Sequence, residues 1–214
     1  MIILEIRKLT RTDDLSRAAE ILFQADPYIM PDLLGDQKTA GLVGGYLFSE
    51  DNNQLFCFDR TLVAVLNGQI QGILCYRTDV CRWDEQHLRN AFLENGLALP
   101  EMFDRVNREY FDKVAREQLP ENSAECMFLA VAQERRGSGI GSCLLERWSL
   151  GGKDAYYLDV LENNELAITL YKRYGFEVTH KHYAYPCSMK KACLTLCFVK
   201  QNLYKMQNYM RRRK

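Results

Sequence analysis

A glycine-rich turn between an apolar run and an amphipathic segment constrains this chain more than any other feature. Residues 126–131 read Cys-Met-Phe-Leu-Ala-Val, which is typical of a short strand buried on both faces. Arg-Gly-Ser-Gly-Ile-Gly follows at 136–141, and apolar residues then recur with helical spacing to Trp148. Glycines let the backbone approach a ligand closely, and the unpaired amides of the next helix attract negative charge. We therefore expect this turn to hold a pyrophosphate.

Other glycine-rich phosphate loops fit the turn less well. A Walker loop is excluded because no Gly-Lys-Ser/Thr follows. A dinucleotide-binding loop requires Gly-x-Gly-x-x-Gly, whereas Ser142 stands here in place of the third glycine. A structural turn without a ligand remains an alternative, since one glycine is enough to turn a chain from strand to helix.

The first part of the chain predicts a strand, helices and a hairpin. Residues 2–7 alternate apolar and polar as in a strand, and helical spacing from Leu15 predicts a helix that ends near Asp26-Pro27. A second helix is expected within 33–48. Asn67-Gly68 supplies the positive φ angles of a tight turn and therefore predicts a hairpin of strands 61–66 and 69–76.

The second part predicts an insertion followed by alternating strands and helices. Residues 78–124 are charged, with aromatic and apolar residues spaced for a helix face, and we interpret them as a helical insertion. Strands are expected at 126–131, 156–161, 176–183 and 193–199. One helix is expected from Ile140 through Trp148, closed by Gly151-Gly152, and another at 164–174. We expect one α/β domain over residues 1–200 and a solvated basic tail over 201–214.

Composition narrows the possible partners. Twenty-eight basic residues balance 28 acidic residues, so no net charge would attract nucleic acid or an anionic membrane. No apolar run is long enough to span a bilayer and no secretory signal is evident, so we expect a cytoplasmic protein. The cysteines lie mostly in apolar runs, and neither they nor the three histidines have the spacing of a metal site, so no metal is expected.

Two ordered motifs carry a resemblance to the GNAT superfamily of N-acetyltransferases. Arg136, Gly139 and Gly141 match its Arg-x-x-Gly-x-Gly signature, and the preceding Leu129-Ala130-Val131 resembles its fourth strand. The resemblance implies acetyl-CoA as cosubstrate, with main-chain groups of Leu129 and Val131 on its pantetheine arm. It also implies that the diphosphate is held by the amides of Arg136, Gly137, Ser138, Gly139, Ile140, Gly141 and Ser142. The implied fold is an α+β domain with a mixed, mostly antiparallel, splayed sheet flanked by helices, and residues 78–124 inserted between its third and fourth strands.

The second motif places a candidate acid beside the cofactor. Residues 164–176 resemble the family's Asn…Ala…Leu-Tyr…Gly-Phe helix, in which Ala167 and Tyr171 share one face. We expect Asn164 to meet the pantetheine amides and Tyr171 to protonate the departing thiolate. The alternative for Tyr171 is packing alone.

The resemblance also suggests a base and a reaction. Glu125 begins the fourth strand as does the base of histone acetyltransferases of this superfamily, although charged residues also commonly begin strands in solvent. The implied reaction is direct attack of a primary amine on the thioester, with a small molecule or a peptide as acceptor. Trp83, Phe92, Phe103 or Tyr110 of the insertion are expected to shape the acceptor site or simply to pack.

Three rival functions stay open. The first is an inactive CoA-binding sensor or partner module of the same fold, and the second is a transferase for a longer acyl-CoA. The third is a nucleotide-binding protein unrelated to CoA. The acceptor and the oligomeric state, with a homodimer among the options, are not fixed by the sequence.

Overall fold

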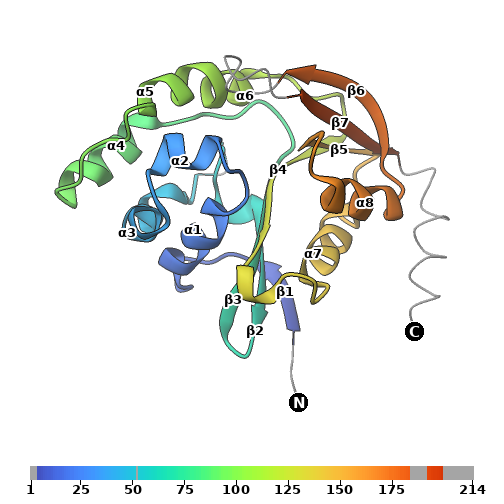
Figure 1. The fold of residues 1–214 in the computed structure, drawn as a ribbon, viewed down its shortest axis with the longest axis horizontal. Coiled ribbons are helices and arrows are strands. Elements are labelled where there is room, and N and C mark those ends of the chain that lie inside the picture. The colour runs from blue at the N-terminus through green and yellow to red at the C-terminus, as the bar shows by residue number, and fades with distance from the viewer. Residues whose placement is uncertain (1–3, 52, 184–191, 200–214) are drawn as a thin grey trace.

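Seven strands form one open sheet in the order β1-β2-β3-β4-β5-β7-β6 (Figure 1). The computed structural model describes residues 4–51, 53–183 and 192–199. Every neighbouring pair of strands is antiparallel except β4 and β5, which are parallel. The strands are β1 Leu4–Lys8, β2 Thr61–Leu66, β3 Gln69–Arg77, β4 Ser123–Val131, β5 Ala155–Leu161, β6 Glu177–Tyr183 and β7 Ala192–Val199.

Helices cover both faces of the sheet and build a core on each (Figure 1). On one side of β1–β4 lie α1, α2 and α3, and on the other lies α7, with α8 beneath β5–β7. The helices are α1 Leu15–Phe23, α2 Ile29–Leu34, α3 Gln37–Leu47, α4 Glu85–Glu94, α5 Phe103–Val106, α6 Asp112–Arg116, α7 Ile140–Ser149 and α8 Glu165–Arg173. Gly72 of β3 lets α7 approach the sheet, because a Cβ there would lie 2.8 Å from Ile140 Cγ2.

The predicted hairpin and insertion are confirmed. Asn67 and Gly68 have φ angles of 52° and 78° and join β2 to β3. Helices α4, α5 and α6 follow β3 and precede β4 in the chain; in Figure 1, α5 and α6 run along the top above α2, and α4 lies at the left. A π-helical turn, Asn107–Phe111, connects α5 to α6.

Two helix boundaries differ from the sequence expectation. The first helix ends at Phe23, before Asp26-Pro27. The single helix expected within 33–48 is two helices, since Gly35 adopts a φ of 80° and Asp36 caps α3 by accepting from the Thr39 amide at 2.7 Å. A capping aspartate after a left-handed glycine starts a new helix rather than continuing the old one.

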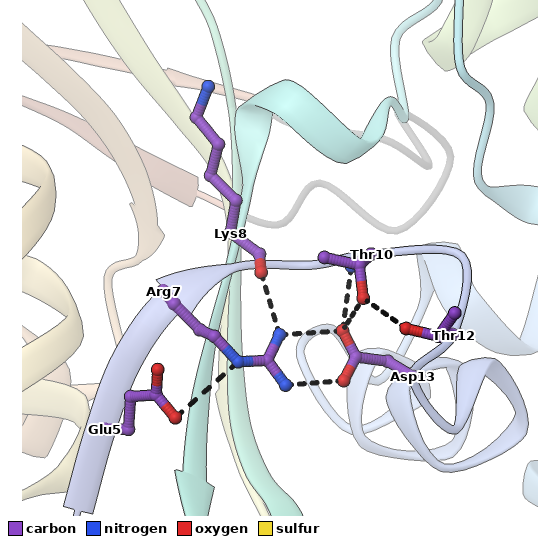
Figure 2. A network of polar contacts seen from close by, with 6 residues as sticks. All are labelled: Glu5, Arg7, Lys8, Thr10, Thr12 and Asp13. Carbon is purple, nitrogen blue, oxygen red and sulfur yellow. Dashed lines mark hydrogen bonds and ion pairs between the residues drawn. The ribbon is translucent and has the colours of Figure 1, made fainter.

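A polar network fixes the entry to α1 (Figure 2). Arg7 of β1 donates to both carboxylate oxygens of Asp13, at 2.7 and 2.5 Å. The Thr10 amide and hydroxyl each donate to Asp13 Oδ2 at 2.8 Å. The Arg7 guanidinium, followed by the Thr10 donors, lowers the pKa of Asp13 to about 2 against the opposing effect of burial. This network anchors the turn between β1 and α1.

The expectations for the C-terminal tail, the cysteines and membrane-spanning segments can be compared with the structure only over the described residues. The basic tail expected at 201–214 lies outside the described residues. The seven cysteines described are all free, with Cys143 and Cys197 only half-buried. In the part of the chain that the structure describes, no helix is long and apolar enough to cross a membrane.

Candidate active site in the cleft between β4 and β5

The parallel strands β4 and β5 separate and open a cleft. They pair only where Ser123–Cys126 runs beside Ala155–Leu158. Beyond Cys126, β4 remains paired with β3, but its other edge has no strand partner among the residues that the structure describes. A cavity of about 420 Å³ lies at this separation, lined by residues of β4, β5, α8, the α1–α2 connection and the insertion. Unpaired strand edges leave main-chain groups free to bind a ligand.

The glycine-rich turn follows β4 and leads into α7. Gly137 and Gly139 have φ angles of 77° and 88°, which a side chain rarely tolerates, and a Cβ at either would point into open space. Gly139 is the N-cap of α7 and provides no side-chain acceptor. Within the described residues, no side chain accepts a hydrogen bond from the first amides of this helix. The turn therefore keeps the unpaired amides that an anion requires.

Arg136 and Ser138 hold the shape of this turn. Arg136 Nε donates to the carbonyl of Val131 at 3.4 Å, and its Nη2 donates to Gln24 Oε1 at 3.3 Å. Ser138 Oγ donates to the carbonyl of Arg135 at 2.6 Å. Both side chains thus stabilise the turn. The backbone amides of Arg136 and Ser138, predicted to meet a ligand, donate to the carbonyls of Gln133 and Arg135, both at 3.3 Å, whereas those of Gly137 and Gly139 make no hydrogen bond with a described residue.

The predicted pantetheine residues divide into two groups. Leu129, Asn164 and Ala167 line the cavity. Asn164 also caps α8, because its Oδ1 accepts from the Ala167 amide at 3.2 Å. Ala130 and Ile140 are buried in the core and Val131 packs against it, so they offer backbone groups rather than side chains.

Tyr171 reaches the cavity from α8. Its side chain is 8% exposed, lines the cavity and packs against Phe176 with ring centroids 6.1 Å apart. Burial raises the pKa of its hydroxyl well above the usual value of 10.0, so the group is protonated at neutral pH. Its hydroxyl makes no hydrogen bond with any described residue. A protonated hydroxyl without a protein partner is free to serve a ligand.

Glu125 lies apart from the cavity wall. Its Oε2 accepts from Arg77 Nε at 2.6 Å, and Arg77 is completely buried. Arg77 also contacts the carbonyl of Glu117 at the end of the insertion. Burial raises the pKa of Glu125, and the Arg77 charge opposes this shift. The carboxylate therefore ties β4 to β3, and its predicted role as base is not tested by these contacts.

Two cavity residues were not singled out from the sequence, Asp26 and Asp159. Asp26 lies within the α1–α2 connection, where its Oδ1 accepts from the amides of Tyr28 and Ile29, both at 2.7 Å. Asp159 is the one charged residue in the apolar strand β5, a signal that the sequence does contain. It lies 3.3 Å from Nε2 of His182.

Of the four aromatic residues considered in the insertion, Tyr110 lines this cavity. Phe92 and Phe103 are buried and pack edge to face at 5.9 Å. Trp83 lines a separate cavity of about 130 Å³ and donates to Asn107 Oδ1 at 2.6 Å. The π-helical turn carries Tyr110, and such turns frequently occur at functional sites.

The comparisons with known proteins agree with this fold. Residues 107–178 match the model of the acetyltransferase (GNAT) domain. An N-acetyltransferase from Staphylococcus aureus Mu50 is similar in structure, with a TM-score of 0.62 and 17% identity over 91% of this chain and 100% of the other. No match to a curated protein reaches significance.

Two further structures are similar over nearly their whole length. The ribosomal-protein-S18-alanine N-acetyltransferase from Escherichia coli has a TM-score of 0.51 and 16% identity, over 92% of this chain and 94% of the other. A GNAT family acetyltransferase from Elizabethkingia anophelis, with acetyl-CoA bound, has a TM-score of 0.52 and 15% identity over 92% and 97%. The splayed sheet and its cleft are those of an acetyltransferase fold. Residues 107–178 thus match a GNAT acetyltransferase domain and the chain has the fold of these acetyltransferases, in agreement with the resemblance carried by its motifs.

Proposed function

We propose that this protein transfers the acetyl group of acetyl-CoA directly to a primary amine. The observation that supports it is the glycine-rich turn, with outward-facing positions at Gly137 and Gly139, which directly follows β4, the strand that lines the cleft. In this arrangement the amides of residues 136–142 hold the diphosphate, and Leu129, Asn164 and Ala167 flank the pantetheine arm. Acetyl-CoA supplies the thioester.

The residues of the cleft would stabilise the negative charge that develops during the reaction and would transfer protons. As the amine attacks the carbonyl carbon, a backbone amide on the free edge of β4 stabilises the oxyanion. The C–S bond then breaks, and Tyr171 gives its proton to the thiolate. Its raised pKa keeps the hydroxyl protonated at neutral pH, so it faces the thiolate as a donor.

The amine must lose a proton before it attacks, and two carboxylates are candidates for the base. Glu125 is the residue predicted from the resemblance, but it is bound to Arg77. Asp159 lines the cavity and contacts His182, which offers a route for the proton to solvent. The variants Glu125→Gln and Asp159→Asn separate these candidates, because the true base gives the larger loss of kcat as the pH is lowered.

The direct test is to incubate the purified protein with acetyl-CoA and a panel of amines. Thiol release and mass spectrometry should report an acetylated amine and free CoA. Tight binding of acetyl-CoA with no product from any amine would instead favour the sensor. Competition between acetyl-CoA and longer acyl-CoA donors identifies the preferred acyl group.

A further inference from the structure

The charges on the cavity wall have one sign. Among the residues described along it, Asp26 and Asp159 are the charged ones, and no lysine or arginine contributes to the lining. These aspartates come from opposite sides, the α1–α2 connection and β5. A cleft lined by one sign of charge concentrates ligands of the other sign.

Asp26 is held in place and makes no ion pair with a described residue. The Tyr28 and Ile29 amides fix its Oδ1 at 2.7 Å each. Burial raises the pKa of its carboxyl despite these bonds, so its charge lacks full compensation within the protein. A half-buried carboxylate that has no cation beside it among the described residues favours a cationic ligand.

Tyr110 lies where the negative charges converge. Burial is the main cause that raises the pKa of its hydroxyl, and the charges of Glu125, Asp26 and Asp159 raise it further. The negative charges of Glu125, Asp26 and Asp159 thus all affect the Tyr110 hydroxyl. Glu125 forms an ion pair with Arg77, and Asp159 contacts His182. Asp26 is the one of these three carboxylates that has no such contact with a described residue.

We propose that the acceptor is an aliphatic amine that carries a second cationic group, and that Asp26 binds this second group. The proposal rests on the acetyl transfer proposed above. The reacting nitrogen must be neutral when its lone pair forms the C–N bond, so it cannot neutralise Asp26 as well. One proton passes to a carboxylate of the cleft before the attack. The C–N bond then forms, the C–S bond breaks as Tyr171 protonates the thiolate, and the second proton lost from the nitrogen as the amide forms restores the Tyr171 hydroxyl.

A series of three amines of equal chain length tests the charge selectivity. These are 1,4-diaminobutane, 1-aminobutane and 4-aminobutanoate, which end in a cation, a methyl group and an anion. We expect kcat/KM to fall at least tenfold from the first to the second, and further for the third. A lysine-containing peptide, assayed beside 1,4-diaminobutane, distinguishes a peptide acceptor from a free amine.

The variant Asp26→Asn tests the residue. Asparagine keeps the Oδ1 that accepts from Tyr28 and Ile29, so the loop retains its bonds while the charge is lost. We expect KM for 1,4-diaminobutane to rise about tenfold and KM for 1-aminobutane to change less than twofold. Glu121→Gln, which removes an exposed negative charge away from the cavity, should change neither.

Thermal-shift titrations with the same amines, in the presence of CoA, separate this proposal from the proposed activity. Stabilisation by 1,4-diaminobutane without acetylation of any amine would refute the activity and leave the cationic site standing. Equal stabilisation by all three amines, or equal kcat/KM for them, would overturn the cationic site. An Asp26→Asn variant that keeps the preference for 1,4-diaminobutane would overturn the role of Asp26.

Discussion

Replacing Tyr171 by phenylalanine removes one hydroxyl and tests the proposed chemistry. The hydroxyl has no protein partner among the described residues, so its loss should change the free energy of unfolding by less than about 0.5 kcal/mol. General acid catalysis typically contributes 100-fold or more. We therefore expect kcat to fall about 100-fold, which corresponds to about 2.7 kcal/mol of transition-state stabilisation.

Binding and rate should respond differently in this variant. Calorimetry should give a Kd for acetyl-CoA within about twofold of the parent value, because the ring still packs against Phe176. Tyr174→Phe is the matched control, since Tyr174 is buried at the end of the same helix but does not line the cavity. Because the pKa of Tyr171 is raised above 10.0, its ionisation should not reduce kcat of the parent protein below that pH.

A Tyr171→Phe protein that keeps more than half of the parent kcat would refute the role of this hydroxyl. A fall in kcat that is matched by Tyr174→Phe would do the same, because it would report a general disturbance of α8.

Three further substitutions test the turn, the packing and the polar network. Gly139→Ala places a side chain at a φ of 88° and should cost about 1 kcal/mol of stability and weaken acetyl-CoA binding about tenfold. Gly152→Ala, at a φ of 84° and also facing open space, should cost the same stability and leave binding unchanged, and equal losses of binding would contradict the assignment. Gly72→Ala should lower the free energy of unfolding by about 1–3 kcal/mol in chemical denaturation, because its Cβ would meet Ile140; an unchanged midpoint would contradict this contact. Asp13→Asn should cost about 1–2 kcal/mol at pH 7, since the pKa of Asp13 is lowered from 3.8 to about 2 on folding. That stability is present above pH 3.8 and is lost as the pH falls through 2, so a cost that persists at pH 2 would contradict the linkage.

Local patterns predicted the secondary structure because they act over few residues. Asn67-Gly68 fixes a turn by its own φ preferences, and the apolar run before Arg136 predicted a strand. Burial of this strand on both faces was wrong, because buried residues of β4 alternate with half-buried ones. The break at Gly35-Asp36 was missed because the apolar residues on both sides suggested one helix. The position of β7 between β5 and β6 depends on pairings between distant residues, which periodicity does not encode.

The site was predictable where a motif is contiguous and not where a contact crosses the fold. The glycine turn and Tyr171 follow from short motifs; Tyr171 lines the cavity, and the turn follows the strand β4 that lines it. The pairing of Glu125 with Arg77 depends on the register of β3 against β4. Asp26 lines the cavity because the α1–α2 connection lies beside residues of β4 and β5. No local sequence pattern predicts this tertiary contact.

The most direct test of the central claim is a crystal structure of this protein with acetyl-CoA. We expect the diphosphate oxygens to lie about 2.7–3.2 Å from amides of residues 136–142, and the thioester to lie between β4 and β5 near Tyr171. A coenzyme bound elsewhere on the protein, with these amides facing only water, would contradict the account.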